Sequence, residues 1–204
     1  MTILEQIKNL KENSKKRNFN QTYDLIINLK DLDLKKAENK IDEIIILPKK
    51  LNKEKKITIF TDSIKKSEDF NIISSSKIES ISKNKKEISE LISKSDFFFA
   101  EPKLMPIVGK FLGKYLAPRG LMPKPLVGPL ESYKKYKNAV KIKVDKQPVI
   151  HTVVGSQDMK DEDVEKNIEF LINTLKVKLP KGKNNIKEVL LKFTMSKPIK
   201  LEVK

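Results

Sequence analysis

Apolar residues at helical spacing predict two amphipathic helices near opposite ends of the chain. The first begins at Ile3 and ends at Leu10, with Ile7 on the same face, and a polar stretch follows it. The second covers Asp161–Leu175, because acidic side chains crowd its first turn, where they stabilise a helix N-terminus. Its apolar face consists of Val164, Ile168, Leu171, Ile172 and Leu175.

Runs rich in isoleucine, valine and phenylalanine predict the strands. Val140–Val144 alternates apolar and polar residues with a period of two, and Val149–Val154 is predicted to be its partner strand. Two strands near the C-terminus, Glu188–Thr194 and Ile199–Val203, are predicted to flank a short turn. Further strands are predicted at Thr22–Leu29, Ile41–Leu47, Ile57–Phe60, Ile72–Ile73 and Asp96–Ala100.

Strands and helices alternate in the middle of the chain. Helical segments are predicted at Ser63–Asp69, Lys85–Ser93 and Leu104–Leu116, whereas the serines at 74–76 are predicted to form a bridge. Such alternation is typical of a small α/β sandwich with parallel strands. The predicted fold class is therefore α/β.

Glycine and proline are concentrated between residues 102 and 129, which hold four of the six Gly and six of the ten Pro. This region contains the string LAPRGLMPKP, Leu116–Pro125. Its prolines fix φ on both sides of a turn, so a stiff backbone presents Arg119 at little conformational cost. The alternative is a surface loop whose arginine is merely solvated.

The nearby sequence GKFLGKY, Gly109–Tyr115, does not match a phosphate-binding loop. That motif needs four residues between its glycines and a Ser or Thr after the lysine, whereas three residues and Tyr115 occur here. The two glycines are instead predicted to allow close packing of a helix.

The chain offers little material for catalysis or for a metal centre. It has no Cys, which excludes disulfides, thiol catalysis, Fe–S clusters and cysteine zinc sites. The single histidine, His151, lies in an apolar run with no second His to complete a metal site. Asp158, Asp161 and Asp163 are better explained by a helix N-terminus than by a metal. We therefore expect no metal, no cofactor and no catalytic residues.

The charge balance indicates a polyanionic partner. The 204 residues include 43 Lys and Arg against 27 Asp and Glu, which gives a formal net charge of +16. Only two of the basic residues are Arg, as in proteins from AT-rich genomes, but such a bias does not create a surplus over the acids. Neutralising phosphates releases condensed counterions, so nucleic acid is the favoured partner. Neither a signal peptide nor a membrane span is apparent, so a soluble cytoplasmic protein is expected.

Two polar patches have the composition of RNA-contacting loops. The first, Arg17–Thr22, combines a cation, the aromatic Phe19 and hydrogen-bonding side chains just before a strand. The second is the turn Thr194–Lys197, which includes Met195 and Ser196. Small polar residues let a phosphate or a ribose hydroxyl approach the backbone, and Phe or Met can cover a sugar or a base. Ordinary loop chemistry is the alternative for each patch.

The sequence resembles the L-one family of universal large-subunit ribosomal proteins, in its archaeal-like form. The string PRGLMPKP, preceded by EPKLMPIVGKFLGKYLA, is similar to the family signature and contains Pro118, Arg119, Gly120, Met122 and Pro123. Further matches follow in order over almost the whole chain: KRNFNQT, the LP after Ile41–Ile46, IHTVVG and FTM.

The resemblance implies two domains joined by a hinge. Residues 1–55 and 137–204 would form a discontinuous RNA-binding α+β domain, and residues 56–136 an inserted three-layer α/β domain. It also implies a non-enzymatic protein of the large ribosomal subunit. Such a protein binds large-subunit ribosomal RNA at the mobile stalk, assists release of tRNA from the exit site, and represses translation by binding its own mRNA. We expect a monomer when the protein is free.

The resemblance places the RNA site on both polar patches and after the IHTVV strand, at Phe19, Thr22, Gly155, Ser156, Thr194, Met195 and Ser196, with Arg17 beside it. Ser196 stands where many family members have Gly, and Ala117 and Lys124 also depart from the family pattern. The signature loop belongs to the inserted domain in this family. Arg119 is therefore a weaker candidate for contact with ribosomal RNA.

Two alternatives belong to other functional classes. One is a small α/β enzyme that uses the Gly109–Gly113 helix for a phosphorylated ligand, although a nucleophile with a base and a proper phosphate loop are missing. The other is a basic scaffold that binds membranes or acidic proteins. Nucleotide titration and liposome sedimentation distinguish these alternatives from RNA binding.

Overall fold

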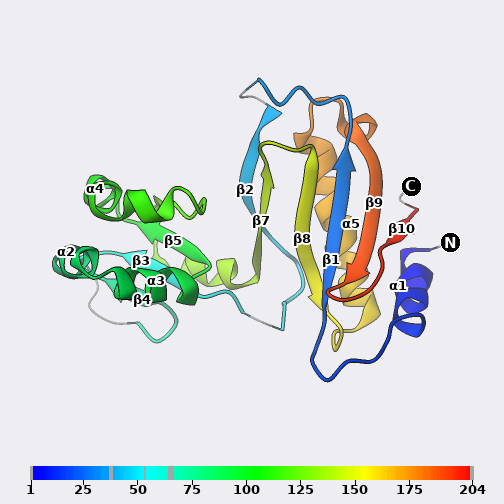
Figure 1. Ribbon diagram of the computed structural model, residues 1–204, viewed down its shortest axis with the longest axis horizontal. Coiled ribbons are helices and arrows are strands. Elements are labelled where there is room, and N and C mark those ends of the chain that lie inside the picture. Colours follow the sequence, from blue (N-terminus) through cyan, green and yellow to red (C-terminus); the bar gives the residue numbers. More distant parts are fainter. Residues whose placement is uncertain (1, 37–38, 53, 64–66, 203–204) are drawn as a thin grey trace. The chain divides into compact units, whose positions relative to one another are not determined.

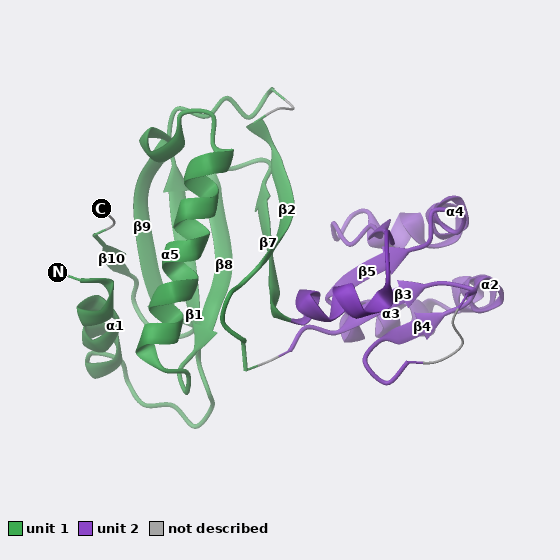
Figure 2. Ribbon diagram, turned by 180° about the vertical axis from the view of Figure 1, so that it is seen from behind, with its two compact units in different colours: residues 1–53, 138–204 green, residues 54–137 purple. Residues whose placement is uncertain are grey.

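The computed structural model describes residues 2–36, 39–52, 54–63 and 67–202 (Figure 1). The chain separates into two compact units, and the second is inserted within the first (Figure 2). Unit 1 comprises residues 1–53 and 138–204, and unit 2 comprises residues 54–137. Both units combine helices with sheets, which confirms the predicted α/β fold class.

Unit 1 is built on a four-stranded antiparallel sheet with the strand order β10-β9-β1-β8. Every second residue of β1 is buried, as the sequence alternation predicts, so one face of the sheet carries the core. The strands are β1 (Thr22–Leu29), β8 (Val149–Ser156), β9 (Ile186–Phe193) and β10 (Ile199–Leu201).

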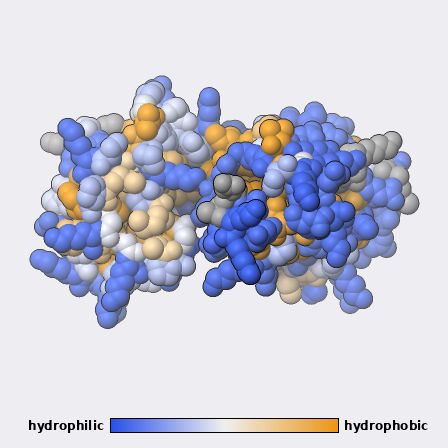
Figure 3. All heavy atoms as spheres, turned by 90° about the horizontal axis from the view of Figure 1, so that it is seen from above, coloured by the Kyte–Doolittle hydropathy of each residue, from blue (hydrophilic) through white to orange (hydrophobic). Residues whose placement is uncertain are grey.

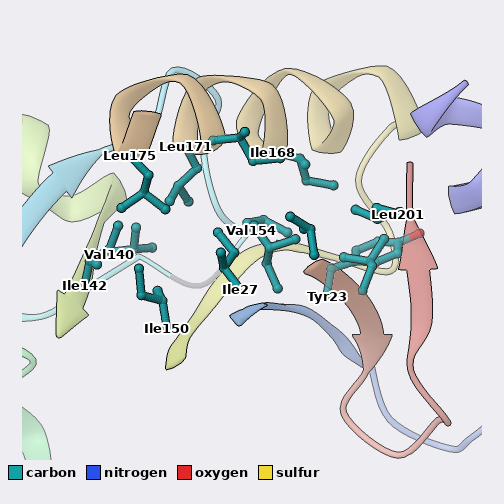
Figure 4. Packing of buried hydrophobic residues seen from close by; sticks show 14 of the residues in the cluster. Tyr23, Ile27, Val140, Ile142, Ile150, Val154, Ile168, Leu171, Leu175 and Leu201 are labelled. Atoms are coloured by element: carbon teal, nitrogen blue, oxygen red, sulfur yellow. The ribbon is translucent and has the colours of Figure 1, made fainter. Parts of the chain in front are cut away.

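Helix α5 (Asp161–Lys178) covers the core face of this sheet. The predicted apolar stripe is buried against side chains of β1, β8 and β9, among them Tyr23, Ile27 and Val154 (Figure 4). Helix α1 (Ile3–Glu12) begins with a capping box between Thr2 and Glu5, and a 3₁₀ turn, η3 (Gly182–Asn185), leads into β9. Both predicted helices of this unit are confirmed.

The predicted pairing of Val140–Val144 with Val149–Val154 is wrong. Strand β7 (Ala139–Val144) pairs with β2 (Ile41–Ile46) in a separate antiparallel two-stranded sheet, whereas β8 pairs with β1. The turn before β8 is already bound to the larger sheet, because the amide of Leu29 donates to the carbonyl of Pro148 at 2.8 Å. Nearness in sequence therefore did not decide the partner.

Unit 2 contains a parallel sheet with the order β4-β3-β5-β6, as the alternation of strand and helix predicts. The strands are β3 (Ile57–Phe60), β4 (Asn71–Ile73), β5 (Phe97–Ala100) and β6 (Lys124–Pro125). The two central strands, β3 and β5, are buried along their whole length. Their continuous apolar runs are typical of strands covered on both faces.

The helices of unit 2 are α2 (Ser75–Lys83), α3 (Lys85–Lys94) and α4 (Met105–Leu116), and the 3₁₀ segment η2 (Leu130–Asn138) leads back towards unit 1. The predictions for α3 and α4 are confirmed. The helix predicted at Ser63–Asp69 falls partly on residues 64–66, which lie outside the described residues, and none of its described positions is helical.

The predicted serine bridge is wrong, because it forms the start of α2. Serine is only a moderate helix former, but α2 is stabilised by two contacts with other parts of unit 2. The carboxylate of Asp62 accepts a hydrogen bond from the amide of Ser75 at 2.8 Å, and Ile78 is fully buried in the core. Tertiary contacts thus stabilise a helix that local composition does not indicate.

The predicted packing role of the α4 glycines is also wrong. Apart from its chain neighbours and the backbone of its own helix, a Cβ atom built on Gly109 or Gly113 meets no heavy atom of the described residues within 4 Å. The helix instead packs through Val108, Leu112 and Leu116, which are buried. Neither glycine is therefore needed for close approach inside the protein.

Candidate RNA interface

The predicted RNA-contacting residues of unit 1 gather where three strands meet at one end of the sheet. Thr22 begins β1 and lies opposite Ser156, which ends β8, while Tyr23 lies opposite both Gly155 and the last residue of β9. Thr194 follows β9 directly. This end is at the bottom of Figure 1, where the loop into β1, the end of β8 and the turn between β9 and β10 lie together. We call it the strand-end surface.

A hydrogen-bonded pair of threonines forms the centre of the strand-end surface. The amide of Thr22 donates to the hydroxyl of Thr194 at 3.1 Å, and the amide of Thr194 donates back to the carbonyl of Thr22, also at 3.1 Å. The Thr22 hydroxyl donates to the Asp24 carboxylate at 3.1 Å and lies 3.0 Å from the Thr194 hydroxyl. Because a hydroxyl has a single hydrogen, Thr194 is the donor in the hydroxyl pair.

The turn between β9 and β10 is closed by Ser196. Its hydroxyl accepts from the amide of Phe193 at 2.8 Å and donates to the carbonyl of Lys197 at 3.1 Å. Among described residues other than glycine, only Asp31 has a positive φ, so Ser196 fits the turn without backbone strain. Met195, at the tip, is 61% exposed, which makes its side chain available to a partner.

Gln21, which belongs to the predicted patch Arg17–Thr22, positions other residues of the candidate site. It is only 2% exposed, its side-chain oxygen accepts from the amide of Met195 at 3.3 Å, and its carbonyl accepts from the amide of Gln157 at 2.8 Å. It therefore joins the loops after β8 and β9 to the start of β1. The burial of Gln21 can be predicted from the alternation in β1, because Gln21 lies two residues before Tyr23 and continues the series of buried positions.

Gly155 has a packing reason for lacking a side chain. A Cβ atom at this position would lie 2.9 Å from Cγ2 of Val164 and 3.4 Å from the sulfur of Met159. Both atoms belong to the region where α5 begins, so the missing side chain would point into the core. Ser156 is buried beside it.

Arg17 and Phe19 lie in the segment between α1 and β1 and are exposed, Phe19 by 50%. An acidic group lies at the same end of the sheet. Hydrogen bonding by the side chain of Asn20 lowers the pKa of Asp158, so this carboxyl group is ionised at neutral pH. The strand-end surface thus combines hydrogen-bond donors and acceptors, exposed apolar side chains and negative charge, rather than positive charge alone.

The signature loop belongs to unit 2 and does not join this cluster. Gly120 has φ of 65°, and the amides of Gly120 and Leu121 donate to the carbonyls of Ala117 and Leu116 at 2.9 and 3.0 Å. This pattern is a Schellman motif that ends α4, and it explains the glycine. In the same loop Pro118, Arg119 and Met122 are exposed, while Pro123 is buried.

The described part of the chain contains no group of three His, Cys, Asp or Glu side chains that could hold a metal ion. His151 is exposed on β8, opposite Ile26 of β1. No helix among the described residues is long and apolar enough to span a membrane.

Comparison with known proteins connects this geometry to a family. The model of the ribosomal protein L1p/L10e family matches residues 10–197, which include the strand-end surface and the signature loop. The chain belongs to this family. The resemblance inferred from PRGLMPKP and the flanking matches is confirmed, and membership of a family of ribosomal proteins contradicts the small-enzyme alternative.

Archaeal relatives match the chain over nearly its full length. The protein of Methanothermobacter thermautotrophicus is 39% identical over 98% of both chains, and that of Methanobrevibacter smithii is 40% identical over 95% of both. The protein of Methanosarcina acetivorans is 41% identical over 96% of both. Each of these relatives is named large ribosomal subunit protein uL1.

Proposed function

We propose that this chain is a component of the large ribosomal subunit and binds large-subunit ribosomal RNA through the strand-end surface. The observation that carries the proposal is the convergence of Thr22, Ser156 and Thr194, which belong to segments far apart in the chain yet meet at three adjacent strand ends. Exposed Met195 and Phe19 lie on the segments that flank them. Family membership and the net charge of +16 support RNA as the ligand.

The composition of the surface favours recognition of folded RNA by shape. Hydroxyls and backbone amides suit contact with phosphates and ribose 2′-OH groups, while Met and Phe suit contact with a sugar or a base face. The carboxylates of Asp158 and Asp24 repel a nearby phosphate, and they can accept hydrogen bonds from base amino groups or from 2′-OH groups. We infer that such acidic groups make binding selective rather than merely electrostatic.

Unit 1 is accordingly proposed as the RNA-binding domain and unit 2 as the inserted domain. We further propose that the protein acts at the mobile stalk near the tRNA exit site, contacts exit-site tRNA, and represses translation by binding a similar structure in its own mRNA. It would be cytoplasmic with the ribosome and monomeric when free. Light scattering of the purified protein tests the last point, since a dimeric mass would contradict it.

The RNA proposal is tested by filter binding of the purified protein to the stalk fragment of large-subunit ribosomal RNA. Thr194→Ala and Met195→Ala should each weaken binding by about 1 to 3 kcal/mol. Lys86→Ala is the control, because Lys86 is exposed on α3 in unit 2, and it should have far less effect. Affinity should fall steeply with salt. Equal small effects from the three variants, or equal affinity for an unrelated duplex, would show that the site is misplaced.

A further inference from the structure

A pocket lies at the end of the unit 1 sheet that is opposite the strand-end surface. Lys30, which follows β1, and Ile186, which begins β9, both line this pocket, so it lies where β1 finishes. Further lining residues come from η3, β10 and α5, and the volume is about 480 Å³, within the range of ligand-binding clefts. Figure 3 views this end of unit 1 from above, on the right, and hydrophilic side chains predominate there.

The pocket exposes an edge of β9. Strand β10 pairs with β9 only from Val189 to Leu191. Among the described residues, Ile186–Glu188 therefore have a strand partner on the β1 side alone. An open strand edge presents backbone amides and carbonyls in the pattern that an added strand requires. Three residues of strand extend over about 10 Å, which is enough for a short extended peptide to pair.

Gln6 of α1 binds the end of β10 and separates it from this edge. Its side-chain oxygen accepts from the amide of Glu202 at 3.2 Å, and its side-chain nitrogen donates to the carbonyl of Lys200 at 3.5 Å. Gln6 is only 6% exposed, so its position is fixed by packing. The amide of Glu202 is thus used by α1 rather than by β9, and the pairing of β10 with β9 ends at Leu201.

The lining of the pocket carries a surplus of positive charge. Five lysines and two glutamates belong to it, and the carboxylate of Glu188 accepts from the side-chain amide of Asn28 at 2.8 Å. Within the described part of the chain, four of these lysines have no carboxylate within 4 Å: Lys30, Lys183, Lys187 and Lys200. Elsewhere in the unit, Lys49 binds Asp163 at 3.0 Å. The surplus favours an anionic partner.

The chemistry of the lining favours a peptide over other anionic partners. A phosphate chain only accepts hydrogen bonds and is repelled by the two glutamates, whereas a peptide backbone both donates and accepts, as the β9 edge requires. Buried Val189 and Leu201 give the pocket an apolar floor that suits an apolar side chain. A second copy of this chain would bring the same lysine-bearing edge, and like charges opposite each other on paired strands are unfavourable.

We propose that the open edge of β9 is a docking site for an extended acidic segment of another protein, which adds to the unit 1 sheet as a strand beside Ile186–Glu188. Side chains alternate across a strand, so apolar residues of the segment would cover Val189 and Leu201. Acidic residues would lie on the opposite face, where Lys200 is placed by its pairing with Leu190, and at the ends of the segment. The proposal does not depend on the RNA site, which lies at the other end of the sheet.

The test compares two triple variants of the full chain with the same change in charge. K183Q/K187Q/K200Q removes three lysines of the pocket, and K8Q/K146Q/K166Q removes three exposed lysines elsewhere in unit 1. Each variant lowers the net charge from +16 to +13. Circular dichroism first establishes that both variants fold like the parent protein.

The probe is a fluorescein-labelled synthetic peptide in which glutamate alternates with valine, with further glutamates at both ends. A control peptide has the same side chains and an N-methylated backbone, so it keeps the charge but cannot pair as a strand. Fluorescence anisotropy at low salt should show that the pocket variant binds the probe roughly 10-fold more weakly than the control variant. The parent protein should bind the methylated peptide at least roughly 10-fold more weakly than the probe.

Hydrogen exchange locates the contact. The probe should slow the exchange of amides within Ile186–Glu188, and the methylated peptide should not. No binding of the probe to the parent protein at millimolar concentration, equal weakening by the two triple variants, or equal affinity for the two peptides would overturn strand addition. Tighter binding to inorganic polyphosphate than to the probe would assign the pocket to phosphates. A dimeric mass without peptide, reduced to a monomeric mass by the probe, would assign the edge to a second copy.

Discussion

Replacing Gly155 by alanine should destabilise unit 1, because the new methyl group would enter an occupied space. Its Cβ would lie 2.9 Å from Cγ2 of Val164, 3.4 Å from the sulfur of Met159 and 3.6 Å from Cδ2 of Tyr23. Val164 is fully buried and β-branched, so its side chain has little freedom to move. Overpacking of this kind costs about 1 to 3 kcal/mol, although the loss of a flexible glycine offsets about 0.5 to 1 kcal/mol.

A double-mutant cycle with Val164→Ala isolates this contact. Val164→Ala alone removes two buried methyl groups and should cost about 2 to 3 kcal/mol. In the double variant the methyl group introduced at position 155 occupies part of the vacated space, so the cost should be about 1 to 2 kcal/mol less than the sum of the single costs.

The free energies of unfolding can be measured by urea titration with far-UV circular dichroism, and hydrogen exchange assigns each transition to its unit. Gly109→Ala is the matched control, because its new Cβ meets no described atom within 4 Å beyond its chain neighbours and the backbone of its own helix. In the middle of α4 it should stabilise unit 2 by about 0.5 to 1 kcal/mol. A neutral Gly155→Ala variant, or strictly additive effects in the cycle, would refute the assignment of Gly155 to packing.

Two further predictions concern the positioning of the candidate site and the stability of unit 2. Gln21→Met keeps the side-chain volume but removes the acceptor for the Met195 amide. This amide should therefore exchange hydrogen faster, and stalk RNA should bind about 1 kcal/mol more weakly. An unchanged exchange rate would show that Gln21 does not position the turn. Hydrogen bonds from Lys134 and then Lys137 lower the pKa of Asp69 to about 2, below its ordinary 3.8. The contribution of ionised Asp69 to the stability of unit 2 is therefore present above the ordinary pKa and is lost as the pH falls towards 2. Unit 2 should unfold more readily over that range in an acid titration. The Asp69→Asn variant should show a weaker pH dependence in the same titration.

Much of the secondary structure was predictable because it reflects local periodicity. The alternation in β1 and the apolar stripe of α5 each report which side of an element is buried, and both are confirmed. The signature string around Arg119 also indicated the family, which the comparisons confirm. The residues expected to contact RNA were predicted from the composition of two polar patches and from this resemblance, and their role remains a prediction.

The partners of each element were decided only by the tertiary structure. Strand β7 pairs with β2 although the whole of unit 2 separates them in the chain, and α2 begins at a serine because the carboxylate of Asp62 caps it from another segment. Neither contact leaves a periodic signal in the sequence, since pairing depends on which surfaces remain available when the chain packs.

The same distinction applies to the strand-end surface. The sequence by itself determined that Thr22 begins a strand and that Thr194 lies at a turn, since both properties follow from neighbouring residues. Only the fold placed their hydroxyls 3.0 Å apart across 172 positions and buried Gln21 between the loops. The reason is physical: local patterns encode which face of an element avoids water, whereas a binding surface requires the register between strands that are distant in the chain.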